Sequence, residues 1–316
     1  MAHNTDILSA GQKIIIITGP TAVGKTECAI DLALSFNGEI VNCDSRQIYK
    51  YMNIGTAKPT QEQLNTIKHY MIDVVEPSVN FSAAKYVTMA DRCIDEITNA
   101  GKLPFLVGGT GFYIKALLHG LAPLPAIDEE IRIKIREKQK LYGNEVLYET
   151  LKLLDPKDAQ HIKQSDTYRL IRALEVFTAT GKPLIDYLEK HRFSQTRYRY
   201  IYIVLYNSDR QDYHKTINNR VDRMIADGLV DEVKGLIKMG YHAELPAMKT
   251  VGYKEIIDYL NNKEVLSTAV ELIKKHTKAY AKRQITWFKG IKDALWIDLH
   301  DRKQRLIEVI KGFIHA

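Results

Sequence analysis

Residues 19–26 read G-P-T-A-V-G-K-T, which is the G-x-x-x-x-G-K-[ST] spacing of a phosphate-binding P-loop. Glycines at both ends of such a loop allow tight turns, so that consecutive N–H groups point at phosphate oxygens. The lysine adds a full positive charge, and the final threonine hydroxyl reaches a phosphate-bound Mg²⁺. The sequence therefore predicts a polyphosphate site made of Gly19, Pro20, Thr21, Ala22, Val23, Gly24, Lys25 and Thr26.

Two further segments could contribute chemistry beside this loop. Asp44 follows the apolar run 38–43, where a carboxylate serves as a general base, as a hydrogen-bond acceptor, or only as a turn residue. Residues 108–111 read G-G-T-G, a second glycine loop in which Thr110 supplies a hydroxyl donor, although a simple strand-to-helix turn has the same pattern.

The run 103–107 ends in glycine, where many P-loop NTPases carry an acidic residue that holds the metal. Asp209 is the other acidic residue near the end of a predicted strand, but it lies several residues after the end of the run 202–205. The missing acidic partner argues against ATP hydrolysis as the main activity.

Arginines recur at helical spacing later in the chain. Arg169 and Arg172 lie one turn apart, and Arg220 and Arg223 repeat that spacing. Arginine forks suit phosphate groups, but Arg172 could equally form a surface ion pair with Glu175.

Positive charge is concentrated near the end of the chain. Residues 272–292 contain seven lysines and arginines and no Asp or Glu, within a net charge of +7. Lys274, Lys278 and Lys282 share one helix face, where like charges repel. A polyanion would relieve that repulsion, and with a phosphate loop elsewhere a nucleic acid is favoured over a merely solvated face.

The elements that must position these residues alternate between strand and helix. Apolar runs at 14–17, 38–43, 103–107 and 202–205 predict strands, and helical patterns cover 27–36 and 82–100. This alternation predicts an α/β fold with a P-loop NTPase-like core, in which helices flank a mainly parallel sheet. Ligands of such sheets bind beyond the carboxyl ends of the strands, so the P-loop, Asp44 and residues 108–111 should share one edge.

Residues 121–200 have a different pattern and predict a helical insertion between strands of the core. Asp128 is a plausible cap for the strongly charged helix that follows it. A second helical pattern, 168–180, ends at Gly181 and Pro183. The predicted core therefore comprises residues 1–120 and 201–316, the second part with basic C-terminal helices.

Composition sets the remaining bounds. The 316 residues are 45% hydrophobic and 26% charged, as is ordinary for a globular protein, and the apolar runs are too short to span a membrane. We expect no secretory signal and, with three cysteines in no C-x-x-C pair, neither a disulfide framework nor a zinc finger. A cytoplasmic protein is the simplest interpretation.

Taken together, the motifs resemble those of the tRNA dimethylallyltransferases, also called tRNA isopentenyltransferases, in their bacterial form without a zinc finger. They occur in the order of that family over nearly the whole chain. The matching segments are G-P-T-A-V-G-K-T (19–26), D-S-R-Q-I-Y (44–49), I-G-T-A-K-P (54–59), P-F-L-V-G-G-T (104–110), R-A-L-E-V (172–176), V-G-Y-K-E (251–255) and Y-A-K-R-Q-I-T-W (280–287).

The resemblance implies transfer of a dimethylallyl group from dimethylallyl diphosphate to N6 of adenosine 37 in tRNA, with Mg²⁺ as cofactor and diphosphate as leaving group. It implies catalytic roles for Asp44, Thr110 and Arg220, with the P-loop holding the diphosphate and Thr26 reaching the metal. The insertion is expected to hold the anticodon stem-loop of the tRNA, and the protein to act as a monomer. The residues implied to face tRNA are Asp44, Ser45, Arg46, Gln47, Thr110, Arg132, Tyr168, Arg169, Leu170, Ile171, Arg172, Lys278, Lys282, Arg283 and Gln284.

Three other functions share parts of this pattern. A P-loop small-molecule kinase has the same core but little use for a basic C-terminal face. An RNA-binding NTP switch would transfer nothing and would not need Asp44. An adenylate isopentenyltransferase acts on free AMP, whereas the insertion and the basic segment favour a polymeric substrate.

Overall fold

The computed structural model describes residues 11–192 and 195–316, and these divide into two compact units. The insertion is His119–Gln195, and the core unit is formed by the chain on either side of it. The insertion was predicted as 121–200, and the later end is wrong because Tyr200 already belongs to a strand of the core.

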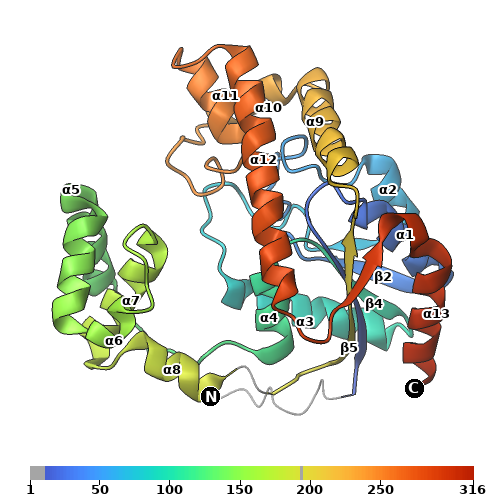
Figure 1. The fold of residues 1–316 in the computed structure, drawn as a ribbon, viewed down its shortest axis with the longest axis horizontal. Coiled ribbons are helices and arrows are strands. Elements are labelled where there is room, and N and C mark those ends of the chain that lie inside the picture. Colours follow the sequence, from blue (N-terminus) through green and yellow to red (C-terminus); the bar gives the residue numbers. More distant parts are fainter. Residues whose placement is uncertain (1–10, 193–194) are drawn as a thin grey trace. The chain divides into compact units, whose positions relative to one another are not determined.

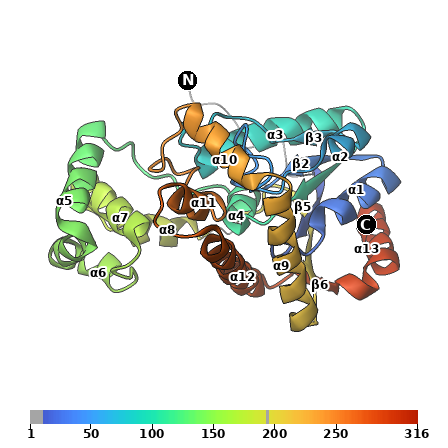
Figure 2. The same ribbon diagram turned by 90° about the horizontal axis from the view of Figure 1, so that it is seen from above.

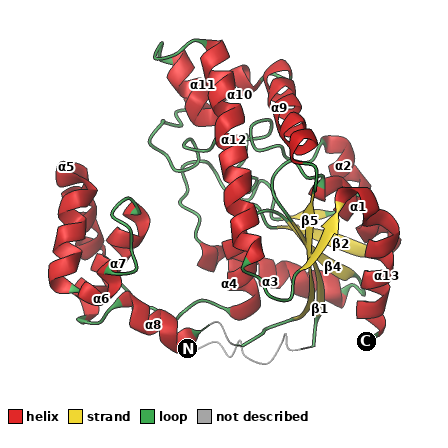
Figure 3. Cartoon of the chain, in the orientation of Figure 1, coloured by secondary structure: helices red, strands yellow, loops and turns green. Residues whose placement is uncertain are grey.

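The core unit contains all six strands of the described chain (Figures 1 and 3). Its elements are β1 (Lys13–Thr18), α1 (Lys25–Ser35), β2 (Gly38–Asn42), α2 (Gln61–Thr66), β3 (His69–Tyr70), α3 (Ala83–Asn99), β4 (Leu103–Val107), α4 (Gly111–His119), β5 (Arg199–Tyr206), α9 (Arg210–Ala226), α10 (Leu229–Lys238), α11 (Tyr253–Leu260), α12 (Leu266–Lys289), β6 (Leu295–Asp298), the 3₁₀ turn η1 (Leu299–Asp301) and α13 (Arg302–His315).

The strands form one parallel sheet in the order β3-β2-β4-β1-β5-β6. This confirms the predicted fold class and all four predicted strands. The short strands β3 and β6 were not predicted, and they add one strand to each edge of the sheet.

Strand β1 shows why the sheet needs cover on both faces. Ile14 and Ile16 pack into one buried cluster, and Ile15 and Ile17 into another. A run of four β-branched residues suits a central parallel strand, because successive side chains point to opposite faces. Helices α3 and α4 contribute to the first cluster, and α1 and α13 to the second, so the sheet lies between two helical layers (Figure 2).

The insertion is helical in its described part and has a core of its own. It comprises α5 (Glu129–Leu154), α6 (Pro156–Ala159), α7 (Thr167–Thr180) and α8 (Leu184–His191). Asp128 caps α5 by accepting from the Glu130 N–H at 3.0 Å, and Gly181 ends α7 in the left-handed conformation, both as predicted. Leu147, Leu151 and Leu170 are completely buried in its centre.

None of the described helices is long and apolar enough to cross a membrane.

Candidate functional site

Three of the predicted segments meet at the carboxyl edge of the sheet. The Cys43 N–H donates to the Val107 carbonyl at 2.6 Å, and the Gly108 N–H donates to Ile17 at 3.2 Å. The Thr18 hydroxyl donates to the Gly108 carbonyl at 2.7 Å. The ends of β2, β4 and β1 are thereby joined, and the P-loop, Asp44 and residues 108–111 lie at one edge, as the strand pattern predicted.

The P-loop leaves β1 through a glycine that no other residue could replace without strain. Gly19 has φ of 144°, and a Cβ placed there would lie 2.2 Å from the Leu205 carbonyl oxygen. Gly24, at φ 79°, precedes α1, so Lys25 and Thr26 open that helix. The positive end of the helix dipole and its free N–H groups therefore face the same space as the Lys25 charge.

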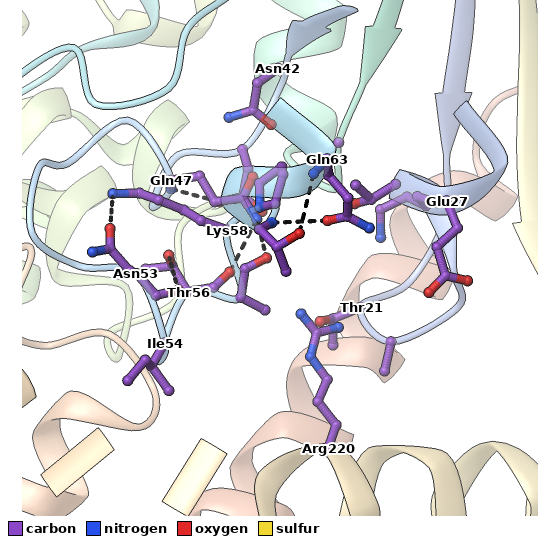
Figure 4. A pocket seen from close by; sticks show the side chains of 18 of the residues that line it. Thr21, Glu27, Asn42, Gln47, Asn53, Ile54, Thr56, Lys58, Gln63 and Arg220 are labelled. Carbon is purple, nitrogen blue, oxygen red and sulfur yellow. Dashed lines mark hydrogen bonds between the residues drawn. The ribbon is translucent and has the colours of Figure 1, made fainter. Parts of the chain in front are cut away.

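A cavity of about 770 Å³ lies over this edge (Figure 4). The P-loop contributes Thr21, Ala22, Gly24, Lys25 and Thr26 to its wall, while Gly19, Pro20 and Val23 are buried beneath. The opposite wall is the segment 53–61, which carries the I-G-T-A-K-P motif. The remaining polar and charged lining residues are Glu27, Asn42, Asp44, Gln47, Gln63, Asp73, Thr216, Arg220, Arg223 and Asp227.

Lys25, Arg220 and Asp44 lie close enough in this cavity to influence one another's charge. Burial, helped by the nearby Arg220 charge, lowers the pKa of Lys25 to about 7, while Asp44 opposes that shift. Burial also lowers the pKa of Arg220, against the influence of Asp44. The guanidinium group of Arg220 points into the cavity (Figure 4). Lys25 and Arg220 are cations that burial has partly removed from water and that repel each other. A bound anion would stabilise the charged form of both side chains.

Asp44 is held in a turn that leaves one carboxylate oxygen available. Its Oδ1 accepts from the Arg46 N–H at 2.8 Å and from the Gln47 N–H at 3.4 Å. Within the described chain, Oδ2 has no hydrogen-bond donor. The Thr110 hydroxyl oxygen accepts from the Ser45 N–H at 2.9 Å, so Thr110 supports the same turn and is not among the residues lining the cavity.

The cavity wall opposite the P-loop is held by a residue that the sequence did not reveal. Glu232, on α10, accepts from the N–H groups of Asn53, Ile54 and Gly55 at 2.9, 2.8 and 3.2 Å. It also accepts from the Tyr253 hydroxyl at 2.5 Å. This carboxylate therefore joins the I-G-T-A-K-P and V-G-Y-K-E motifs, which are about 200 residues apart in the chain.

We expect Glu232→Ala to lower the free energy of unfolding by about 2 to 3 kcal/mol, because three backbone donors and a phenol lose a charged acceptor. Urea denaturation measures this change. The matched control is Asp231→Ala on the same helix, whose carboxylate forms only a solvent-exposed pair with Lys234 at 3.1 Å. That control should change stability by less than about 1 kcal/mol. Equal effects of the two substitutions would contradict the role given to Glu232.

The strand beside β1 does end without an acidic residue, because β4 leads directly into Gly108. Asp209 does not replace it, since its carboxylate caps α9 by accepting from the N–H groups of Gln211 and Asp212 at 2.8 and 3.0 Å. The arrangement typical of ATP hydrolysis is therefore not formed at either position.

Helix α12 carries the predicted basic segment, and two of its residues make contacts that the sequence did not predict. Lys274 is not an unpaired member of the basic face, because its ammonium group lies 2.8 Å from Asp222 and 3.0 Å from Glu271. Gln284 was predicted to face tRNA, but its side chain is buried against the P-loop. Lys282 and Arg283 are exposed, as an RNA-facing role requires.

In the insertion, the predicted arginines already have carboxylate neighbours. Arg132 lies 3.2 Å from Glu129, Arg169 lies 3.3 Å from Asp166, and Arg172 lies 3.1 Å from Glu175.

The apolar and aromatic residues predicted for tRNA contact on α7 differ in exposure. Leu170 is fully buried, so its side chain is not exposed at the surface where RNA contact was predicted. Ile171 is partly buried and packs against the insertion core. Tyr168 is 80% exposed, so its ring is accessible for stacking on a base.

Most of the chain is similar in sequence to one family of known proteins. A model of the IPP transferase family matches residues 47–291. A tRNA dimethylallyltransferase of Acetivibrio thermocellus is 45% identical over 304 residues, which cover 95% of this chain and 97% of that protein. A tRNA dimethylallyltransferase of Geobacter sulfurreducens is 45% identical over 286 residues, which cover 90% of this chain and 92% of that protein.

Two solved structures are similar over most of the chain. The full-length tRNA isopentenylpyrophosphate transferase of Bacillus halodurans is 37% identical, with a TM-score of 0.71 and coverage of 96% of both chains. A eukaryotic dimethylallyltransferase acting on tRNA is 28% identical, with a TM-score of 0.82 and coverage of 96% of this chain and 80% of that one.

Proposed function

Since the chain belongs to the IPP transferase family, we propose that it transfers a dimethylallyl group from dimethylallyl diphosphate to N6 of adenosine 37 in tRNA. One observation supports this most directly: Asp44 lines the same cavity as Lys25 and Arg220. A carboxylate beside an anion site does not bind a diphosphate directly, because like charges repel, but it can accept a proton from a nucleophile.

In this proposal the P-loop holds the diphosphate of the substrate. Its N–H groups, the Lys25 ammonium and the Arg220 guanidinium neutralise the charge that develops as the bond between carbon and the diphosphate oxygen breaks. Donors fixed in place before the reaction contribute most to such stabilisation, because they need no reorganisation in the transition state.

Thr26 offers the Mg²⁺ ligand that a P-loop usually supplies, and its side chain lines the cavity. The described residues contain no group of three or more His, Cys, Asp or Glu side chains able to hold a metal alone. A hard cation held by one hydroxyl, phosphate oxygens and water fits that donor set. When bound, Mg²⁺ supplies further positive charge beside the diphosphate.

Asp44 acts on the nucleophile. The free Oδ2 accepts a hydrogen bond from the N6 amine, which orients its lone pair toward the prenyl carbon. As the nitrogen–carbon bond forms, one N6 proton passes to this carboxylate and the diphosphate departs with the bonding electrons. The amine is a weak nucleophile, so orientation supplies much of the rate. The adenine must leave its stack to enter the cavity.

The remaining parts of the proposal concern the tRNA. The insertion, through Arg132, Tyr168, Arg169 and Arg172, binds the anticodon stem-loop, and the exposed charges of α12 contact phosphates. Exposed Tyr168 and the charges at Lys282 and Arg283 support this assignment. We further propose that the protein acts as a monomer in the cytoplasm.

The double substitution Lys282→Ala with Arg283→Ala should weaken tRNA binding and flatten its dependence on salt. The expected change is about one to two units in the slope of log K against log[salt], at roughly 0.7 to 0.9 per phosphate contact. Filter binding over a salt series measures the slope. Lys274→Ala is the control on the same helix, because two carboxylates already neutralise that charge. An unchanged slope in the double variant would show that these side chains do not meet phosphate.

The proposed function is tested with radiolabelled dimethylallyl diphosphate, Mg²⁺ and either unmodified tRNA or AMP. We expect label in tRNA, none in AMP, and loss of label when adenosine 37 is replaced. Label in AMP would indicate an adenylate isopentenyltransferase instead. No transfer to either acceptor, with turnover of ATP, would indicate a kinase.

A further inference from the structure

We propose that Gln284 is a positioning residue that fixes the P-loop for the diphosphate, and that it does not contact RNA. This inference rests on the proposed prenyl transfer. Gln284 is buried and only 5% exposed, although Lys282 and Arg283, the two residues before it on α12, are exposed.

Both ends of this amide are bonded to the site. Oε1 accepts from the Thr21 N–H at 2.8 Å, and Nε2 donates to the Gly109 carbonyl at 2.9 Å. One partner is a donor and the other an acceptor, so the two bonds together define the orientation of the amide. Gln284 therefore joins the P-loop to the loop 108–111, across 263 and 175 residues of sequence respectively.

The loop 108–111 contains glycine where α12 approaches. A Cβ on Gly109 would lie 2.3 Å from Gln284 Nε2, and a Cβ on Gly111 would lie 2.1 Å from Trp287 Nε1. The G-G-T-G loop and the A-K-R-Q-I-T-W segment of α12 therefore pack directly against each other. Neither glycine is needed here for a left-handed backbone, since neither has positive φ.

Thr21 is held from its other side as well. The Tyr213 hydroxyl, on α9, donates to the Thr21 carbonyl at 2.6 Å. The next residue, Ala22, has φ of 65°, a conformation that costs a non-glycine residue about 1 to 2 kcal/mol and persists only when its surroundings impose it. Gln284 and Tyr213 supply that constraint, and Thr21 and Ala22 both line the cavity.

A positioning role and an RNA-contact role predict opposite results. Gln284→Met keeps the side-chain length and removes both hydrogen bonds. If the side chain positions the P-loop, KM for dimethylallyl diphosphate at saturating tRNA should rise about tenfold, while Kd for tRNA stays within about twofold of the wild type. An RNA contact would instead weaken tRNA binding and leave this KM unchanged, and that result would overturn the proposal.

Two further variants separate positioning from a general loss of stability. Gly109→Ala leaves Gln284 in place but displaces its amide, so it should raise the same KM. In the double variant Gly109→Ala with Gln284→Met, the free-energy change calculated from KM should be smaller than the sum of the two single changes. Tyr213→Phe removes only the hydroxyl that holds the Thr21 carbonyl, and it should raise the same KM. All rates are measured well below the Tm of each variant. Additive effects, or unchanged KM in all variants, would overturn the proposal.

Failure of the proposed function would be visible separately, as a wild-type chain that transfers no label to tRNA. The same variants can then be compared by calorimetry with inorganic diphosphate and Mg²⁺. Weaker binding in Gln284→Met would support the positioning role, and equal binding would overturn it.

Discussion

Asp44→Asn should lower kcat for prenyl transfer by about 10²- to 10⁴-fold, the range that a positioned general base contributes. The substitution removes the proton acceptor but keeps an oxygen that can accept from the Arg46 and Gln47 N–H groups, as Oδ1 does now. The turn that carries the residue is thereby preserved. We therefore expect the affinity for tRNA to stay within several-fold of the wild type. Single-turnover rates with saturating tRNA measure the chemical step.

Asp44→Ala should abolish transfer, because it removes the proton acceptor and also the oxygen that accepts from the Arg46 and Gln47 N–H groups. Asp31→Asn is the control for the loss of one negative charge, because Asp31 lies on the exposed face of α1. Normal turnover in Asp44→Asn would remove the base assignment. A large loss of tRNA affinity with an unchanged chemical step would make Asp44 an RNA-binding residue instead.

Lys25→Met should lower kcat/KM for dimethylallyl diphosphate by about 10²- to 10³-fold, as expected when one fixed group that stabilises developing charge is removed. Lys25 lines the cavity at the start of α1, where the N–H groups and the helix dipole act on the same anion. The loss should therefore be severe but incomplete, and tRNA binding should be unaffected. Steady-state kinetics with varied dimethylallyl diphosphate measure it.

The pH dependence tests the same residue. The pKa of Lys25 is about 7, because burial and Arg220 lower it. Below that pH the Lys25 side chain is already cationic in the free protein. Above that pH it is neutral, so it must first take up a proton before a charged lysine can bind the diphosphate. The affinity for dimethylallyl diphosphate should therefore fall as pH rises above about 7, by up to about tenfold per pH unit. Lys25→Arg, which stays charged, should lose this dependence, and an unchanged profile would contradict the assignment.

Most of the core was predictable because its signals are local. The four isoleucines of β1, the glycine loop after them and the helical repeat of α3 each specify an element without reference to distant residues. Strand β3 could not be predicted, since His69 and Tyr70 are two residues that become a strand only by pairing with Ile40 and Val41. Strand β6 is similarly short and depends on its register with β5.

The site was predictable where side chains follow strand ends, as Asp44 and Lys25 do. It was not predictable where the decisive contact joins remote segments. The sequence motif placed Gln284 among basic residues that suit RNA, but helical geometry turns it inward to Thr21 and Gly109. Glu232 lies in an ordinary amphipathic helix, and its three backbone partners are 177 to 179 residues away. Only the packing of α10 onto the 53–55 turn reveals its role.

In the proposed reaction this P-loop holds a leaving diphosphate and does not transfer a phosphoryl group. The most direct measurement quantifies both products of one reaction containing unmodified tRNA, dimethylallyl diphosphate, ATP and Mg²⁺. We predict equal amounts of released diphosphate and of N6-dimethylallyladenosine at position 37, with ATP unchanged. Consumption of ATP to ADP without modified adenosine would contradict the account.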